Sequence, residues 1–206
     1  MKLLKSLVLA GSLLISHVSS ASLILWLDPD VQPGATGDNI TLTLMAGGLG
    51  DGVPLSLAAF DLDILFDSSV LSFTGYTLFD GLGSLALFEA DDFSLGEYTP
   101  GVVGLSEVSY LSILDLDTFQ LGEFALAELT FNVDLLSAPD FTIVSMTPGL
   151  FGFSDAGGIA FTDVEMRSAL IGTKAVVPAI VPEPSTLVLL SLGMLFVAYR
   201  RKLKIN

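Results

Sequence analysis

The chain has 206 residues, of which 51% are hydrophobic, and this fraction is too high for an intrinsically disordered protein. It has no cysteine, so the fold must be held by its core rather than by disulfides. All 23 Asp and Glu lie between Asp28 and Glu183, where Arg167 and Lys174 are the only basic residues, and such an acidic surface excludes nucleic acid and anionic lipid as expected partners.

The N-terminus is predicted to be a secretory signal peptide over residues 1–21. It has two lysines within the first five residues, a mostly apolar stretch over residues 6–15, and small residues at 19–21. We expect cleavage after Ser20 or Ala21. A membrane helix is disfavoured because the apolar stretch is short and a cleavage site follows it. The only histidine of the chain lies inside this segment, so the mature protein has none.

The middle of the chain is predicted to be all-β. Residues 60–66 alternate between apolar and acidic side chains, which places Asp61 and Asp63 outward and the aromatic and aliphatic residues inward. Similar short runs are separated by Gly- and Pro-containing turns. Strands are expected at 23–27, 40–44, 60–66, 70–76, 102–111, 124–135, 141–146 and 159–170. Together they predict one antiparallel β-sandwich or jelly roll over residues 22–171, followed by an extended linker at 172–180.

The C-terminal segment, residues 181–204, has three parts. Pro182 and Pro184 fix φ and lack an amide hydrogen, so they hold Glu183 in an extended, accessible backbone. Leu187–Tyr199 is an apolar run of about 20 Å as a helix, which spans a bilayer core of about 30 Å only with help from flanking residues. This predicts one short transmembrane helix.

A basic cluster ends the chain: Arg200, Arg201, Lys202 and Lys204. Basic residues beside a membrane segment resist translocation, so export is expected to halt with the Pro-Glu-Pro motif outside the membrane. The order of motif, apolar helix and basic cluster resembles the PEP-CTERM sorting signal of Gram-negative bacteria. The resemblance implies processing by the membrane enzyme exosortase, in organisms that make exopolysaccharide. The alternative is an ordinary tail anchor that stays uncleaved.

The exported part resembles cohesin-like domains. The resemblance covers about residues 22–169 and is carried by four stretches: Val31–Gly34 with Asp38, Ala59–Ile64, Phe66–Asp67 with Leu71, and Phe124–Phe131. It implies a nine-stranded jelly roll. Cohesins bind a calcium-loaded dockerin helix pair, but this chain shows no dockerin and no second cohesin. Dockerin recognition is therefore not carried over with the fold.

Most catalytic chemistry is excluded by the missing side chains. Without His or Cys in the mature chain there is no Ser-His-Asp or Cys-His site and no zinc site of the usual ligand types. Carboxylate pairs for glycoside hydrolysis remain, drawn from Glu89, Glu97, Glu107, Glu123 and Glu128. We expect these to be solvated strand residues, and Trp26 to lie in the core rather than on a sugar platform.

Calcium is the more plausible ligand. Asp61, Asp63 and Asp67 carry the hard oxygen ligands that the ion prefers, and the pairs Asp91–Asp92 and Asp115–Asp117 are alternatives. None fits the spaced calcium-loop motif. Exposed strand acids with Asp67 capping a turn would explain the same residues. No other cofactor is expected.

The sequence therefore predicts an exported, non-enzymatic cell-surface or extracellular-matrix protein. It would be held transiently in the inner membrane, processed by an exosortase-type enzyme and released toward the envelope or the outside. Its β-sandwich would contact a surface protein or exopolysaccharide. The alternatives are an exopolysaccharide-active glycoside hydrolase using paired carboxylates and a plain membrane-anchored structural protein.

Overall fold

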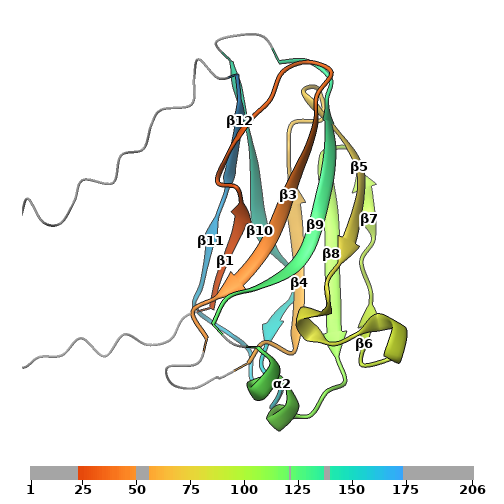
Figure 1. Ribbon diagram of the computed structural model, residues 1–206, viewed down its shortest axis with the longest axis vertical. Coiled ribbons are helices and arrows are strands. Elements are labelled where there is room, and N and C mark those ends of the chain that lie inside the picture. Colours follow the sequence, from red (N-terminus) through yellow and green to blue (C-terminus); the bar gives the residue numbers. More distant parts are fainter. Residues whose placement is uncertain (1–22, 50–55, 121, 137–139, 174–206) are drawn as a thin grey trace, which may run out of the picture.

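The computed structural model describes residues 23–49, 56–120, 122–136 and 140–173, which form a two-layered β-sandwich (Figure 1). The first layer has five strands in the order β11-β1-β3-β9-β5. Their bounds are β1 Leu23–Asp28, β3 Asn39–Gly47, β5 Leu71–Leu78, β9 Phe124–Val133 and β11 Val164–Arg167. All neighbours in this sheet are antiparallel except β1 and β11.

The second layer has seven strands in the order β2-β12-β10-β4-β8-β6, with β7 also paired to β8. Their bounds are β2 Val31–Pro33, β4 Ala59–Leu65, β6 Ala90–Asp92, β7 Gly96–Thr99, β8 Val102–Ser109, β10 Phe141–Ser154 and β12 Ala169–Gly172. The strands β6 and β7 pair with opposite halves of β8, so together they form one interrupted edge strand. The predicted all-β sandwich is confirmed, but it is not wholly antiparallel, because β2 pairs with β12 in parallel, as β1 does with β11.

The hydrophobic core lies between the two sheets. In β4, Phe60, Leu62 and Ile64 are buried while the residues between them are half-buried on the outer face. This is the alternation that the sequence predicts, because successive side chains of a strand point to opposite faces. The rings of Phe66 and Phe131 meet edge to face with centroids 5.2 Å apart, which joins the two layers.

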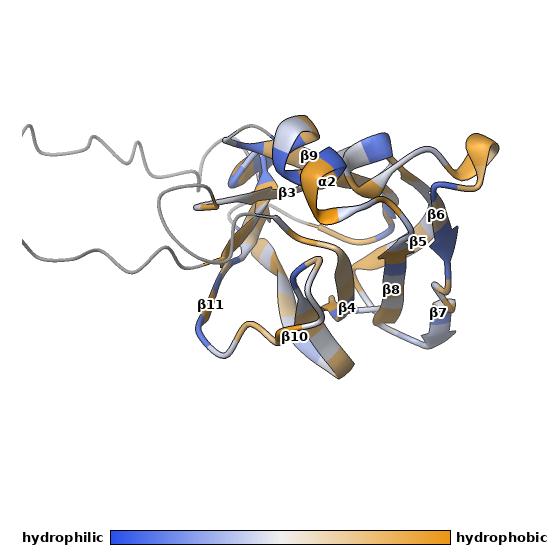
Figure 2. Cartoon of the chain, turned by 90° about the horizontal axis from the view of Figure 1, so that it is seen from below, coloured by the Kyte–Doolittle hydropathy of each residue, from blue (hydrophilic) through white to orange (hydrophobic). Residues whose placement is uncertain are grey.

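Short helices close one end of the sandwich, and the sequence analysis did not predict them. The helix α2 (Ile113–Phe119) begins at Ser112, whose side chain accepts a hydrogen bond from the Asp115 backbone N–H. The 3-10 helices η2 (Asp80–Leu82) and η3 (Leu85–Leu87) lie between β5 and β6 in the chain. Figure 2 shows α2 from below, across the end of the two layers.

The buried amide of Gln120 fastens this end. Its Nε2 donates to the Leu57 and Gly81 carbonyls at 2.7 and 2.9 Å, and its Oε1 accepts from the Leu57 N–H at 2.7 Å. Gln120 follows α2, Leu57 precedes β4 and Gly81 belongs to η2. One side chain therefore joins three segments that are distant in sequence.

Two expectations about strands and packing were wrong. Residues 159–170 do not form one strand, because β11 pairs in the five-stranded sheet and β12 pairs in the seven-stranded sheet, and the chain crosses between layers at Ser168. Trp26 is not in the core, because its neighbours Leu25 and Leu27 on β1 take the inward positions. Its ring instead covers Gly47 on the outer face, where a Cβ on that glycine would lie 3.1 Å from it.

The last described strand, β12, ends at the opposite end of the sandwich from α2 (Figure 1). The predicted signal peptide, the sorting motif, the transmembrane helix and the basic cluster lie outside the described residues. Among the residues that are described, no helix is long and apolar enough to cross a membrane.

Candidate contact groove

A bulge in β10 builds the first wall of a groove on the outer face of the seven-stranded sheet. The pairing of β10 with β4 shifts register between Pro148 and Phe153. The residues between them leave the ladder, and Leu150 and Phe151 are 88% and 85% exposed. Extra residues in one strand of a pair bend that strand and redirect its side chains. The bulge thus holds two large apolar side chains away from the core.

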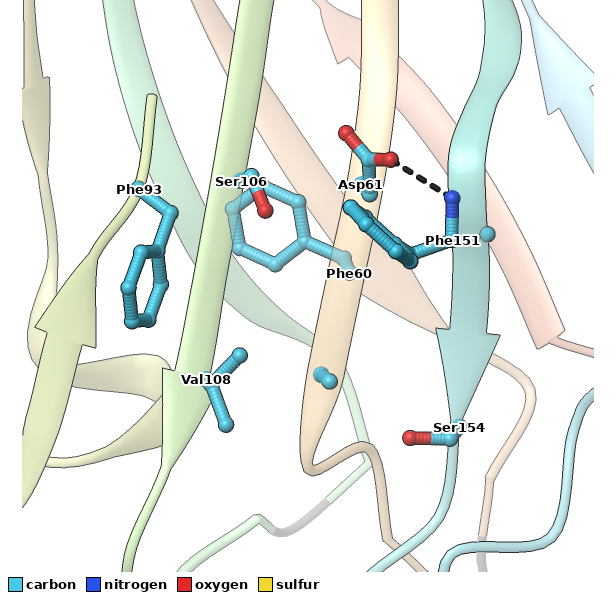
Figure 3. Close-up of a pocket in the computed structure, with 9 residues that line it drawn as sticks. Phe60, Asp61, Phe93, Ser106, Val108, Phe151 and Ser154 are labelled. Atoms are coloured by element: carbon cyan, nitrogen blue, oxygen red, sulfur yellow. Dashed lines mark hydrogen bonds between the residues drawn. The ribbon is translucent and has the colours of Figure 1, made fainter. Parts of the chain in front are cut away.

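Asp61 on β4 holds this bulge in place. Its Oδ2 accepts a hydrogen bond of 2.8 Å from the Phe151 backbone N–H (Figure 3). Gly149 lies directly against the same carboxylate, since a Cβ on that residue would sit 2.5 Å from the Asp61 Cγ. The glycine is required here because any side chain would push the carboxylate away from the bulge. Asp61 and Gly149 together fix the position of the first wall.

The interrupted edge strand builds the second wall. The Phe93 N–H donates to the Ser106 carbonyl at 2.8 Å and the Leu95 N–H donates to the Gly104 carbonyl at 3.0 Å, so the link between β6 and β7 stays bonded to β8. Phe93 and Leu95 are exposed. Tyr98 on β7 lies over Gly104, and a Cβ added to that glycine would be 3.2 Å from the tyrosine ring. A larger residue at 104 would displace that ring.

The walls enclose two adjoining hollows of about 420 and 410 Å³ that share Asp61, Phe93, Ser106 and Phe151. Figure 3 shows Phe93 on one side of the first hollow and, on the other side, the Phe151 side chain next to Asp61. The second hollow adds Asp63 and Tyr98. Partial desolvation and the Asp63 carboxylate raise the pKa of the Tyr98 hydroxyl above its usual value. The groove therefore combines an acidic floor with apolar and aromatic walls.

The predicted calcium ligands are only partly brought together. Asp61 and Asp63 face outward on β4 as expected, but Asp67 lies beyond the end of that strand. Its Oδ1 accepts hydrogen bonds from the Ser69 N–H and hydroxyl at 2.9 and 2.6 Å, which lower its pKa. Asp67 therefore caps a turn, as the alternative to calcium binding expected. The described residues contain no group of three acidic side chains able to hold a metal ion, and weak calcium binding stays a prediction.

Three acids of the other two candidate pairs have local structural partners. Asp91 accepts a hydrogen bond from the Tyr110 hydroxyl at 2.7 Å, and Asp92 accepts one from the Tyr76 hydroxyl at 2.9 Å. Asp115 accepts a hydrogen bond from the Ser112 hydroxyl at 2.6 Å at the start of α2. These bonds tie β5, β6 and the helical end together and account for Asp91, Asp92 and Asp115 without a metal. The Oδ1 of Asp117 is buried and has no hydrogen-bond partner among the described residues.

The candidate hydrolase carboxylates lie in different surroundings. Glu89 accepts the Ser84 N–H and Glu97 accepts the Gly101 N–H, both at 3.0 Å. Glu123 precedes β9 and Glu128 lies within it, so both belong to the five-stranded sheet. None of these four lines the groove.

Glu107 is the exception to the expectation of solvated glutamates. It is 0% exposed, lies on the inner face of β8, and neither carboxylate oxygen has a hydrogen-bond partner among the described residues. Burial raises its pKa to about 8, and the charges of Asp92 and Asp80 add to the effect. It does not reach the outer groove, so it has no counterpart there for glycoside hydrolysis.

The groove itself was not predicted from the sequence. The apolar residues of its walls come from a stretch between the strands expected at 70–76 and 102–111, and from the far half of β10, which was expected to end near residue 146. The run Pro148–Phe153 is the signal that was available: two large apolar residues between glycines mark exposed side chains held by a bend.

Two kinds of similarity to known proteins accompany this geometry. Residues 181–202 match the family described as the PEP-CTERM protein-sorting motif. No curated protein matches the chain. The sorting motif that the C-terminal residues resemble is therefore confirmed by an independent match, although the match covers only that segment.

The described fold is similar to solved cohesin structures. The solution structure of CaCohA2 from Clostridium acetobutylicum covers 76% of this chain and 93% of its own, at 14% identity and a TM-score of 0.56. The cohesin of the Coh-OlpA–Doc918 complex from Clostridium thermocellum covers 74% of this chain and 99% of its own, at 10% identity and a TM-score of 0.56. A cohesin module of a Clostridium perfringens family 33 glycoside hydrolase covers 74% of this chain and 95% of its own, at 14% identity and a TM-score of 0.53. The cohesin-like fold is confirmed.

Proposed function

We propose that this protein is an exported, non-enzymatic surface protein whose β-sandwich binds a protein partner through the groove between the β10 bulge and the β6–β7 edge. The observation that carries the proposal is the bulge, which holds Leu150 and Phe151 almost fully in solvent. Burying such side chains is favourable by about 25 cal/mol per Å² of apolar surface. An exposed apolar groove of this kind is typical of a contact site.

The C-terminal segment supports the export half of the proposal. A match to a protein-sorting motif at residues 181–202 is consistent with handling by an exosortase-type enzyme at the membrane. The last described strand, β12, ends at the pole opposite α2 (Figure 1). The groove is on the outer face of the seven-stranded sheet, lined by residues of β4, β8, β10 and the β6–β7 edge. A chain held by its C-terminal segment would therefore leave the groove accessible.

Several of the solved cohesins are described as cohesin–dockerin complexes, so this fold presents protein-binding surfaces in those proteins. We extend only the general role, protein contact, to this chain. The geometry does not support the hydrolase alternative, since the candidate glutamates belong to different elements, none lines the groove and Glu107 is buried.

Site-specific photo-crosslinking in the native host tests the proposal. A photoreactive residue replaces Leu150 in the groove wall or, as control, exposed Thr41 on the outer face of the other sheet. We expect a discrete protease-sensitive adduct from position 150, none from position 41, and loss of the adduct when Phe93 on the opposite wall becomes Ser. Equal adducts from both positions, or an adduct resistant to protease and degraded by glycosidases, would overturn the protein-contact assignment.

A further inference from the structure

The floor of the groove carries two carboxylates without a basic partner. Asp61 and Asp63 lie two residues apart on the outer face of β4, which spaces their Cα atoms by about 6.6 Å. The described residues hold a single basic side chain, Arg167, and it is bound to Glu165 at 2.7 Å on β11 in the other sheet. Within the part of the chain that the structure describes, no basic side chain therefore pairs with this floor.

The walls of the groove are aromatic where they face these carboxylates. Phe93 and Tyr98 lie on one side and Phe151 on the other, and all three are at least half exposed. An ammonium or guanidinium group is attracted to aromatic faces and to carboxylates alike. The aliphatic stems of Lys and Arg also pack on apolar surface while the charged head reaches a polar partner. A cationic side chain satisfies the floor and the walls together.

Other occupants leave part of the groove unsatisfied. A purely apolar segment would bury the Asp63 carboxylate without a counter-charge, which is costly. A second copy of this chain would bring another acidic surface, since 21 acidic residues stand against one arginine in the described residues. Anionic polymers are disfavoured for the same reason.

We propose that the groove recognises a Lys or Arg side chain of its partner, presented within an apolar segment, with the charged group beside Asp63 and the apolar neighbours against Phe93 and Phe151. This inference rests on the proposed function, because it names the chemistry of the partner at the same site. Asp63 is the residue that forms the ion pair with the cationic side chain of the partner. Asp61 has a positioning role, since it also holds the bulge.

Fluorescent peptides measure this preference on the mature chain recovered from its host. The probes are seven-residue peptides of alternating Thr and Leu with Arg, Lys, norleucine or Glu at the centre. We expect the Arg and Lys peptides to bind at least about tenfold more tightly than the norleucine peptide, with an affinity that falls as salt rises, and the Glu peptide not to bind. Equal binding of the Arg and norleucine peptides would overturn the inference.

Two substitutions that each remove one negative charge distinguish recognition of the peptide cation at Asp63 from attraction to the overall negative charge of the protein. Asp63→Asn should weaken binding of the Arg peptide about tenfold and leave the norleucine peptide unchanged. Asp134→Asn, at an exposed acid that follows β9, should change neither. Equal losses from both variants would show attraction to the overall negative charge and would contradict a site at Asp63. If crosslinking gives an adduct at position 150 but the Arg peptide binds no better than the norleucine peptide, this inference is refuted while the proposed contact function still stands.

Discussion

The Asp61 carboxylate accepts a hydrogen bond of 2.8 Å from the Phe151 backbone N–H, and this bond links the centre of β4 to the bulge of β10. It pairs a backbone donor that the interrupted ladder between these strands would otherwise leave free. The same acid therefore forms part of the groove floor and fixes one of its walls. An outward acid on a strand, which by its position alone looks like a solvated residue, here has a structural task.

Asp61→Ala should loosen the bulge. We expect a loss of about 1 kcal/mol in the free energy of unfolding, because one charge-assisted hydrogen bond at a half-buried site is removed. The Phe151 amide should exchange its hydrogen faster in the variant. Asp63→Asn is the matched control, since it changes the neighbouring acid of the same strand, and it should leave Phe151 exchange unaltered. Unchanged exchange in Asp61→Ala would contradict the role of this bond.

Gly149→Ala should destabilise the bulge through the same carboxylate. The added methyl would lie 2.5 Å from the Asp61 Cγ, so either the bulge or the acid must move. The free energies of unfolding of both single variants and of the double variant with Asp61→Ala form a double-mutant cycle. We expect the glycine substitution to cost clearly less when Asp61 is already Ala. Additive effects would argue against direct contact between the two residues.

Gln120→Leu should destabilise the helical end of the sandwich by about 3 kcal/mol. The change keeps the size of the side chain but leaves the Leu57 N–H and the Leu57 and Gly81 carbonyls unpaired inside the protein. Chemical denaturation measures the effect. Gln32→Leu is the control, because Gln32 is the only other glutamine of the chain and is half-buried on β2. Similar losses in both variants would contradict the special role of Gln120.

Glu107 should make the stability of the domain depend on pH. Its pKa of about 8 in the folded protein exceeds the value of 4.5 expected for an exposed glutamate. Between these values the folded state holds a proton that the unfolded state has lost, so the stabilising contribution is complete below about pH 4.5 and is lost as pH rises toward 8. The slope from this group is at most about 1.4 kcal/mol per pH unit.

Glu107→Gln should remove that slope, since an amide does not ionise. The free energy of unfolding of the variant relative to the original chain is therefore expected to increase from pH 5 to pH 8 and to level off above it. Glu123→Gln, at an exposed glutamate, should follow the original chain across the range. A constant difference between Glu107→Gln and the original chain would show that Glu107 ionises inside the fold as it does in water.

The strands were predictable because burial on one face leaves a period of two in the sequence. Phe60, Leu62 and Ile64 face the core and Asp61 and Asp63 face outward, as this period requires. The groove was not predictable, because it depends on the register shift after Pro148 and on the split of the edge strand into β6 and β7. Pairing between distant strands decides both features. The local run Pro148–Phe153 marks a bend, but it does not show which strands face each other across the groove.

The buried state of Glu107 was also missed, and for a related reason. Glu107 shares the inner face of β8 with Val103 and Leu105, as its spacing of two residues from Leu105 in the sequence indicates. The prediction of a solvated residue followed from its charge, because glutamates are rarely buried. Helix α2 escaped notice because its seven residues are too few to display a helical period. The local cap at Ser112 and the long-range bonds of Gln120 hold it in place instead.

The intact mass of the protein recovered from its native host tests the central claim, export and sorting of a contact domain, most directly. We predict a chain from the cell surface or the medium that begins at residue 21 or 22 and ends near the motif at Pro182, Glu183 and Pro184. Replacing these three residues by Ala should retain the longer chain, with its C-terminal segment, in the membrane fraction. A full chain of 206 residues in the cytosol, with both ends intact, would contradict the account.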